Sequence, residues 1–297
     1  MSRPQKSTIV RFQNQARRAL FRSADLLAPN LAGRIARDIW FTVPPRLAAT
    51  PLPDGGRPFE VESLGAVVRG HVWGDGPVVY LVHGWGGRGS QLASLVEPLL
   101  VAGFRVVMFD APAHGDSDHG PAGRGRTHGV EFGKALDAVF AKFGPGEAAI
   151  AHSMGALATL LALNYGWFGV KRLVFVAPMA GYAEAMDVFQ SMLGFGPRIR
   201  RRADVLTWRR VGLDDDEFDV RHLWARLPEP LPALVVQDDT DPQAPYEQSR
   251  AIADDIGAEL MTTTRLGHNR VLADARVADR IIRFLEPEER QLTLPAA

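Results

Sequence analysis

The chain has 297 residues, of which 46% are hydrophobic and 23% are charged, and its formal net charge is zero. This is the composition of an ordinary globular protein, and the balanced charge argues against a nucleic-acid partner. The chain contains no cysteine, which excludes a disulfide framework, a thiol nucleophile and a thiolate metal site. It has neither the roughly 18 consecutive apolar residues of a spanning helix nor a signal-peptide pattern, so a cytoplasmic location is expected.

The first 45 residues are strongly basic. They hold eight Lys or Arg against two Asp, and apolar side chains recur among them at helical spacing. Pro29-Asn30 predicts a break between two helices. A basic amphipathic arm of this kind can contact anionic lipid or a partner, but most amphipathic helices face a core. We therefore expect an arm packed on the rest of the protein, with peripheral membrane contact as the alternative.

Strands are predicted after a proline-rich linker at residues 42–56. Alternating patterns predict strands at residues 59–63, 66–73 and 78–82, and short apolar runs then alternate with helical patterns. The runs are residues 104–109, 148–151, 173–177, 233–236 and 259–263, and the helical segments are residues 92–101, 130–143, 156–165 and 277–284. Runs this apolar are typical of a parallel sheet covered on both faces, which predicts an α/β fold.

A segment of about 50 residues, from about 179 to 230, interrupts this alternation. A connection of this length inside a compact domain is usually functional, so we interpret it as a mostly helical cap. The predicted organisation is a basic helical arm at residues 1–45 and a catalytic domain at residues 46–297, with the cap inserted in that domain.

Ser153 lies where a predicted strand meets a predicted helix. A serine on so sharp a turn has its hydroxyl exposed above the sheet, which is typical of a nucleophile. The turn needs small residues on both sides, and Ala151 and Gly155 provide them. The N–H of Met154, at the start of the helix, is a candidate donor to an oxyanion. The alternative interpretation of Ser153 is an ordinary helix N-cap.

Other polar motifs follow other predicted strands. His83-Gly84-Trp85-Gly86-Gly87 follows residues 78–82, and its glycines allow the backbone to approach a ligand. His83 itself, and Asp110 and His114 after the next strand, are interpreted as structural. Asp238, Asp239 and Asp241 follow residues 233–236, and His268 follows residues 259–263.

These motifs resemble those of the α/β-hydrolase superfamily over about residues 60–285, in its order of serine, acid and histidine. Ala151 stands where that family most often has glycine, and Ala113 replaces another of its glycines. The family's acid precedes a proline or small apolar residue, which favours Asp241 over its neighbours. The resemblance implies a mostly parallel sheet flanked by helices, with these roles: Ser153 as nucleophile, Asp241 as acid, His268 as base, and the N–H groups of Trp85 and Met154 as the oxyanion hole.

The expected function is hydrolysis of carboxylic esters through an acyl-enzyme, on a small-molecule substrate. Apolar residues of the predicted cap suggest a small to medium apolar substrate; they are Met179, Phe189, Met192, Leu193, Phe195 and Trp208. The same residues can serve a thioesterase, an amidase, a carbon–carbon hydrolase or an acyltransferase. A non-catalytic binding or membrane-associated protein is the alternative of another class. No cofactor or metal is expected, and the pattern predicts neither the substrate's identity nor the oligomeric state.

Overall fold

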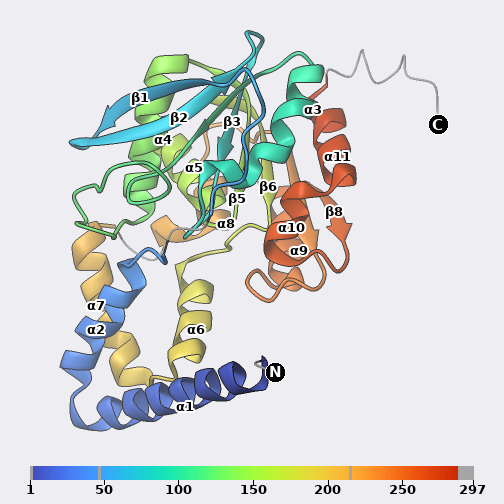
Figure 1. The fold of residues 1–297 in the computed structure, drawn as a ribbon. Helices are drawn as coiled ribbons and strands as arrows, with labels where there is room; N and C mark the ends of the chain where they lie inside the picture. The colour runs from blue at the N-terminus through green and yellow to red at the C-terminus, as the bar shows by residue number, and fades with distance from the viewer. Residues whose placement is uncertain (1–2, 46–47, 214–215, 287–297) are drawn as a thin grey trace. The chain divides into compact units, whose positions relative to one another are not determined.

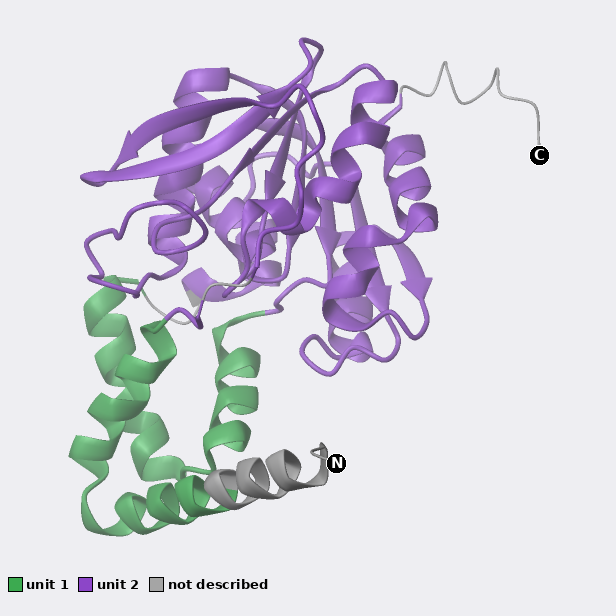
Figure 2. Cartoon of the chain, in the orientation of Figure 1, with its two compact units in different colours: residues 1–42, 181–215 green, residues 43–180, 216–297 purple. Residues whose placement is uncertain are grey.

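The computed structural model describes residues 3–45, 48–213 and 216–286, so residues 46 and 47 of the predicted linker lie outside the described part (Figure 1). Its contacts divide the chain into two units (Figure 2). The helical unit consists of residues 1–42 and 181–215, and the sheet unit of residues 43–180 and 216–297. The arm and most of the predicted cap therefore fold together rather than as two separate attachments.

One sheet organises the sheet unit. Within the described residues it has eight strands in the order β1-β2-β4-β3-β5-β6-β7-β8. The strands are β1 (Arg57–Ser63), β2 (Ala66–Trp73), β3 (Val78–Val82), β4 (Arg105–Phe109), β5 (Gly146–His152), β6 (Val170–Val176), β7 (Ala233–Asp238) and β8 (Glu259–Thr263). β2 is antiparallel to β1 and β4, and the remaining neighbours are parallel. This topology, with its helical additions, confirms the predicted fold class.

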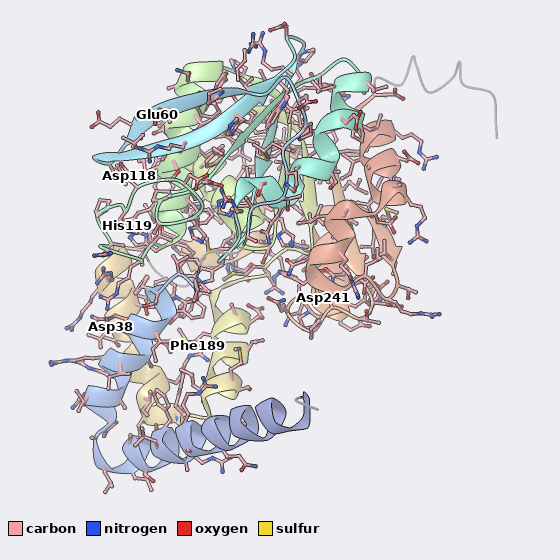
Figure 3. The ribbon with its side chains drawn as sticks, in the orientation of Figure 1. Asp38, Glu60, Asp118, His119, Phe189 and Asp241 are labelled. Atoms are coloured by element: carbon pink, nitrogen blue, oxygen red, sulfur yellow. The ribbon has the colours of Figure 1, made fainter. Side chains whose placement is uncertain are left out.

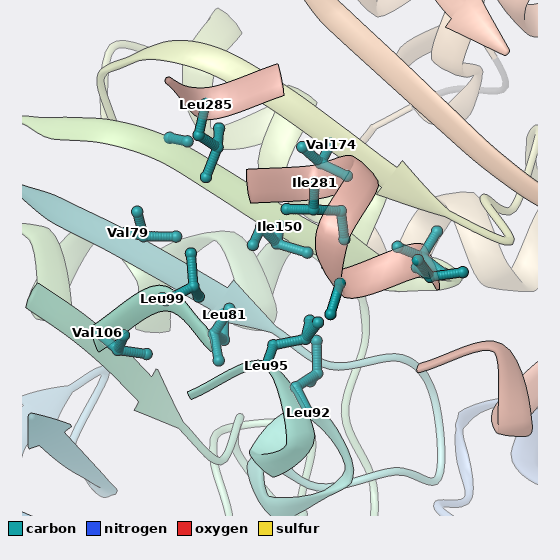
Figure 4. Close-up of a cluster of buried hydrophobic side chains, with 14 of the residues drawn as sticks. Val79, Leu81, Leu92, Leu95, Leu99, Val106, Ile150, Val174, Ile281 and Leu285 are labelled. Atoms are coloured by element: carbon teal, nitrogen blue, oxygen red, sulfur yellow. The ribbon is translucent and has the colours of Figure 1, made fainter. Parts of the chain in front are cut away.

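Helices cover both faces of this sheet, which explains why its central strands are apolar throughout. The helical segments of the unit are η1 (Gly89–Leu95), α3 (Val96–Val101), α4 (Gly129–Phe143), α5 (Met154–Asn164), η2 (Asp216–Phe218), α8 (Val220–Ala225), α9 (Tyr246–Ile256), α10 (Gly267–Arg270), η3 (Val271–Ala273) and α11 (Ala275–Leu285). In β3, Leu81 belongs to a core cluster with residues of α3 and α11 (Figure 4). Tyr80, the residue before it, packs instead on Phe140 and Phe168.

The last helix shows how sequence pattern and packing energy are linked. Val277, Ile281 and Leu285 of α11 recur at intervals of four residues and are fully or almost fully buried. Each such aliphatic side chain contributes about 1.5–3 kcal/mol when it leaves water. Arg276, Asp279, Arg280 and Arg283 occupy the other side of the helix, so one face of α11 attaches it to the sheet.

The helical unit contains α1 (Arg3–Leu27), α2 (Pro29–Phe41), α6 (Tyr182–Leu193) and α7 (Pro197–Val211). α2 begins at Pro29, where the sequence predicted the break, because proline suits the first turn of a helix. The buried carboxylate of Asp25 in α1 accepts a hydrogen bond from the N–H of Ile199 (2.8 Å) in the first turn of α7. Gly33 of α2 packs directly on Arg202 of α7, so the arm and the insertion share one interior. None of the described helices combines the length and hydropathy needed to cross a membrane.

Residues 216–230 of the predicted cap belong to the sheet unit, where α8 packs on α5 and α9. Leu193 and Phe195 are each only 4% exposed, and Phe189 packs on Trp40 inside the helical unit. The apolar character of these cap residues therefore has a structural cause. It no longer supports an apolar substrate.

Candidate active site

Ser153 lies between the end of β5 and the first residue of α5. Its backbone has φ 53° and ψ −122°, in the left-handed region that non-glycine residues avoid, at a cost of about 1–3 kcal/mol. The turn is held by the Ser153 N–H, which donates to the Val176 carbonyl (3.0 Å), and by the Met179 N–H, which donates to the Ser153 carbonyl (3.2 Å). The Ser153 side chain makes no capping hydrogen bond to the described residues of α5. Its strained backbone therefore does not serve an N-cap.

Two glycines bring the loop after β3 against this turn. A Cβ on Gly155 would lie 2.7 Å from the carbonyl oxygens of Val82 and His83. A Cβ on Gly84 would lie 2.8 Å from the Cβ of Ser153. Only glycine permits such close approach without displacement of backbone. The loop that carries Trp85 is thus adjacent to the serine. Among the described residues, the N–H groups of Trp85 and Met154 donate no hydrogen bond.

His83 and His114 brace this loop and are not directed at Ser153. The Nε2 atom of His83 accepts from the Ala111 N–H (3.0 Å), so its Nδ1–H donates to the Gly84 carbonyl (2.8 Å). The Nε2 atom of His114 accepts from the Gly86 N–H (2.9 Å). Burial lowers the pKa of His83 to about 4 and that of His114 to about 3. Both rings are therefore neutral near pH 7, as their acceptor roles require.

Asp238 and Asp239 each have a structural partner. The carboxylate of Asp238 is fully buried and accepts from the Thr240 N–H (3.0 Å), the Thr263 hydroxyl (2.9 Å) and the Leu266 N–H (2.9 Å). It thereby joins the loops after β7 and β8. The carboxylate of Asp239 accepts from the hydroxyl of Thr264.

Asp241 is the carboxylate that contacts His268 (Asp241 is labelled in Figure 3). Its Oδ2 lies 2.7 Å from Nδ1 of His268, and its Oδ1 accepts from the N–H groups of Gln243 (2.8 Å) and Ala244 (3.1 Å). Burial opposes ionisation, but the hydrogen bonds from His268 and the two N–H groups outweigh it and hold the pKa of Asp241 below its ordinary value. The ionised carboxylate fixes the proton on Nδ1, which leaves Nε2 as the acceptor of the neutral imidazole.

His152 is a site residue for which the sequence assigned no role. Its Nε2 lies 2.9 Å from the carbonyl oxygen of His268, and the two rings are 4.6 Å apart. Burial lowers the pKa of His152 to about 3, so this neutral ring can donate its Nε2 proton to the carbonyl. The signal in the sequence was the position of His152, directly before the serine of the turn.

The structure thus places Asp241 against His268 and the Trp85 loop against Ser153. No group of three or more His, Asp or Glu side chains in the described part of the chain is arranged to hold a metal ion. A cavity of about 260 Å³ in the sheet unit is lined by residues of β1, β2 and the segment after Gly87. Neither Ser153, Asp241 nor His268 lines it, so this cavity is separate from their site.

Comparison with known sequences agrees with this topology. Residues 77–207 match the sequence model of the alpha/beta hydrolase fold family, and residues 219–291 match that of TAP-like protein. A curated relative, the pimeloyl-[acyl-carrier protein] methyl ester esterase of Vibrio atlanticus (strain LGP32), is 33% identical over 118 residues. The match spans 39% of this chain and 42% of that protein, less than half of either.

Solved structures show the same fold. An esterase of Pyrococcus furiosus superposes with a TM-score of 0.62 at 19% identity, over 82% of this chain and 97% of that one. A bromoperoxidase of Bacillus anthracis superposes with a TM-score of 0.58 at 17% identity, over 78% of this chain and 100% of that one. The thioesterase domain of the curacin biosynthetic pathway superposes with a TM-score of 0.58 at 16% identity, over 78% of this chain and 99% of that one. The family models, which match residues 77–207 and 219–291, and the sheet order lead to one assignment: the chain belongs to the α/β-hydrolase fold superfamily.

Proposed function

We propose that the protein is a serine hydrolase that cleaves carboxylic esters through an acyl-enzyme. The observation that carries the proposal is the 2.7 Å hydrogen bond between Asp241 and His268, in a unit whose serine lies on a strained strand-to-helix turn. An acid paired with an imidazole, together with a serine on such a turn, are the parts of a nucleophilic triad.

In this mechanism, Nε2 of His268 takes the proton of Ser153 as its Oγ attacks the ester carbonyl. Asp241 stabilises the imidazolium that results. The N–H groups of Trp85 and Met154 donate to the oxyanion, and each such donor contributes about 3 kcal/mol to the transition state. His268 then protonates the leaving alcohol. Water, deprotonated by the same imidazole, hydrolyses the acyl-enzyme and restores Ser153.

A carboxylic ester is favoured because the Vibrio relative acts on a methyl ester. A thioester is the second candidate, since the curacin thioesterase domain shares the fold. Amide hydrolysis, carbon–carbon cleavage and acyl transfer use the same groups, and fold alone does not separate them. A cytoplasmic location stays a prediction.

A fluorophosphonate probe tests the nucleophile. We expect covalent labelling of the intact protein in a one-to-one ratio, and no labelling of the Ser153→Ala variant, because the probe reacts only with an activated serine. A panel of p-nitrophenyl esters of increasing chain length, with a thioester and an anilide beside them, then ranks the substrate classes by kcat/KM. If the wild-type protein does not react, the proposal is contradicted and a non-catalytic binding protein is favoured; equal labelling of the variant would show that Ser153 is not the nucleophile.

His152 is expected to act as a positioning residue through the His268 carbonyl. His152→Phe keeps a ring of similar shape but removes the donor, and we expect a loss of about 10-fold to 100-fold in kcat with KM within about twofold, because small displacements of a general base are costly. His152→Gln keeps an N–H donor and should recover part of the rate. A purely structural role would lower the melting temperature of both variants and leave kcat per folded molecule unchanged.

A further inference from the structure

The helical unit carries an apolar surface that its own packing does not use. Leu31, Ile35 and Ile39 of α2 follow one another at intervals of four residues and are 61%, 46% and 40% exposed. We call these three side chains the α2 stripe. Residues with this spacing lie along one side of a helix, whereas Ala32, Gly33 and Ala36 are buried. Leu20 and Leu26 of α1 add further exposed apolar area, at 70% and 68%.

The same unit concentrates the positive charge of the chain. Residues 1–42 and 181–215 contain 14 Lys or Arg and 7 Asp or Glu, a net charge of +7. Because the whole chain is neutral, the sheet unit has a net charge of −7. Arg34, three residues after Leu31, is exposed beside the α2 stripe, and Arg17, Arg18 and Arg22 of α1 are exposed as well. Asp38, the acidic residue of this part of α2, is paired with Arg37 at 2.6 Å.

We propose that the α2 stripe and Arg34, in a unit of net charge +7, dock the protein on an anionic lipid bilayer. Aliphatic side chains on one helix side enter the boundary of the acyl chains, while guanidinium groups bind the phosphates above it. Neither signal alone gives firm attachment, and this surface has both. The sheet unit, with its net charge of −7, does not add to this attraction.

Charge disfavours a symmetric dimer through this face. A symmetric dimer would bring the same face of two protomers together, and with it two units of net charge +7. Like charges at such short range oppose association. An anionic surface instead gains from each arginine that reaches it. The proposal concerns binding alone and does not depend on the proposed hydrolase activity.

Vesicle sedimentation tests the proposal on the full chain. We expect the protein to pellet with vesicles of phosphatidylcholine and phosphatidylglycerol, with a partition coefficient at least about 10-fold above that for phosphatidylcholine alone. Raised salt should weaken this binding because it screens the arginines. Equal binding to both vesicle types, or no binding to either, would overturn the proposal.

Matched variants locate the contact. Leu31→Glu with Ile35→Glu should reduce binding to the level of phosphatidylcholine vesicles, and Arg34→Gln should reduce it about fivefold. Val101→Glu changes an 86% exposed valine of the sheet unit and should have no effect. Unchanged circular dichroism checks that each variant folds. If light scattering shows a dimer that the double variant abolishes, without vesicle binding, the face belongs to a second copy and the bilayer proposal is wrong.

Discussion

The Asp241→Asn variant is expected to keep its fold and to lose about four orders of magnitude in kcat, with KM nearly unchanged. The wild-type carboxylate accepts the Nδ1 proton of His268 at 2.7 Å. An asparagine amide can present an N–H there, which moves the imidazole proton to Nε2 and leaves no base for Ser153. Steady-state kinetics on the best p-nitrophenyl ester, with the melting temperature as a check on folding, measures the effect.

The neighbouring carboxylates supply matched controls, because the sequence left three aspartates close together. Asp239→Asn removes an exposed contact with Thr264 and should retain kcat within about twofold, since surface changes are usually mild. Asp238→Asn disturbs a buried carboxylate with several donors, and we expect it to lower the melting temperature. If Asp239→Asn loses activity while Asp241→Asn keeps it, the assignment of the acid is wrong.

Acid is expected to destabilise the protein steeply below pH 6.5 because of three buried neutral histidines. Burial lowers the pKa of His83 to about 4 and those of His114 and His152 to about 3. In the unfolded chain each returns to its ordinary value of 6.5, so below that pH the unfolded state binds more protons. The stability they give is complete above pH 6.5 and is lost as the pH falls, toward 4 for His83 and toward 3 for His114 and His152.

The free energy of unfolding is expected to change steeply with pH. Each histidine contributes up to about 1.4 kcal/mol per pH unit, so the three together give about 3–4 kcal/mol per unit near pH 5. A typical domain is stable by about 5–15 kcal/mol, which predicts unfolding at about pH 4–5. Asp238 and Asp241, whose pKa values are lowered, give stability that is lost only below the ordinary carboxyl range. They therefore do not affect the slope near pH 5.

Urea titrations at several pH values between 7 and 4.5 measure this slope. His114→Gln keeps an amide oxygen that can accept from the Gly86 N–H, but it does not titrate. Its slope should be smaller by about a third, because one of three proton-binding groups is gone. A free energy of unfolding that stays constant between pH 7 and 5 would show that these histidines are not neutral in the folded protein.

Local pattern was enough to predict most of the sheet unit. The bounds of β2, β3 and β8 agree with the predicted strands, because alternation and apolar runs record directly which faces are buried. The break at Pro29 was predicted for a similarly local reason. The turn at Ser153 was predicted because its strain needs small residues on both sides, and these are visible in the sequence.

Only the tertiary structure could show the contacts between residues that lie far apart in the sequence. Spacing alone could not choose among Asp238, Asp239 and Asp241, since the choice depends on which carboxylate lies beside a histidine 27 residues away. The same holds for His152, whose partner is 116 residues away, and for Asp25, which joins the arm to the insertion 174 residues later. An amphipathic pattern predicts that a helix has an apolar side. Which of its apolar residues are buried depends on the elements that pack against the helix. In α2 this packing covers Ala32 and Ala36 and leaves the α2 stripe in water.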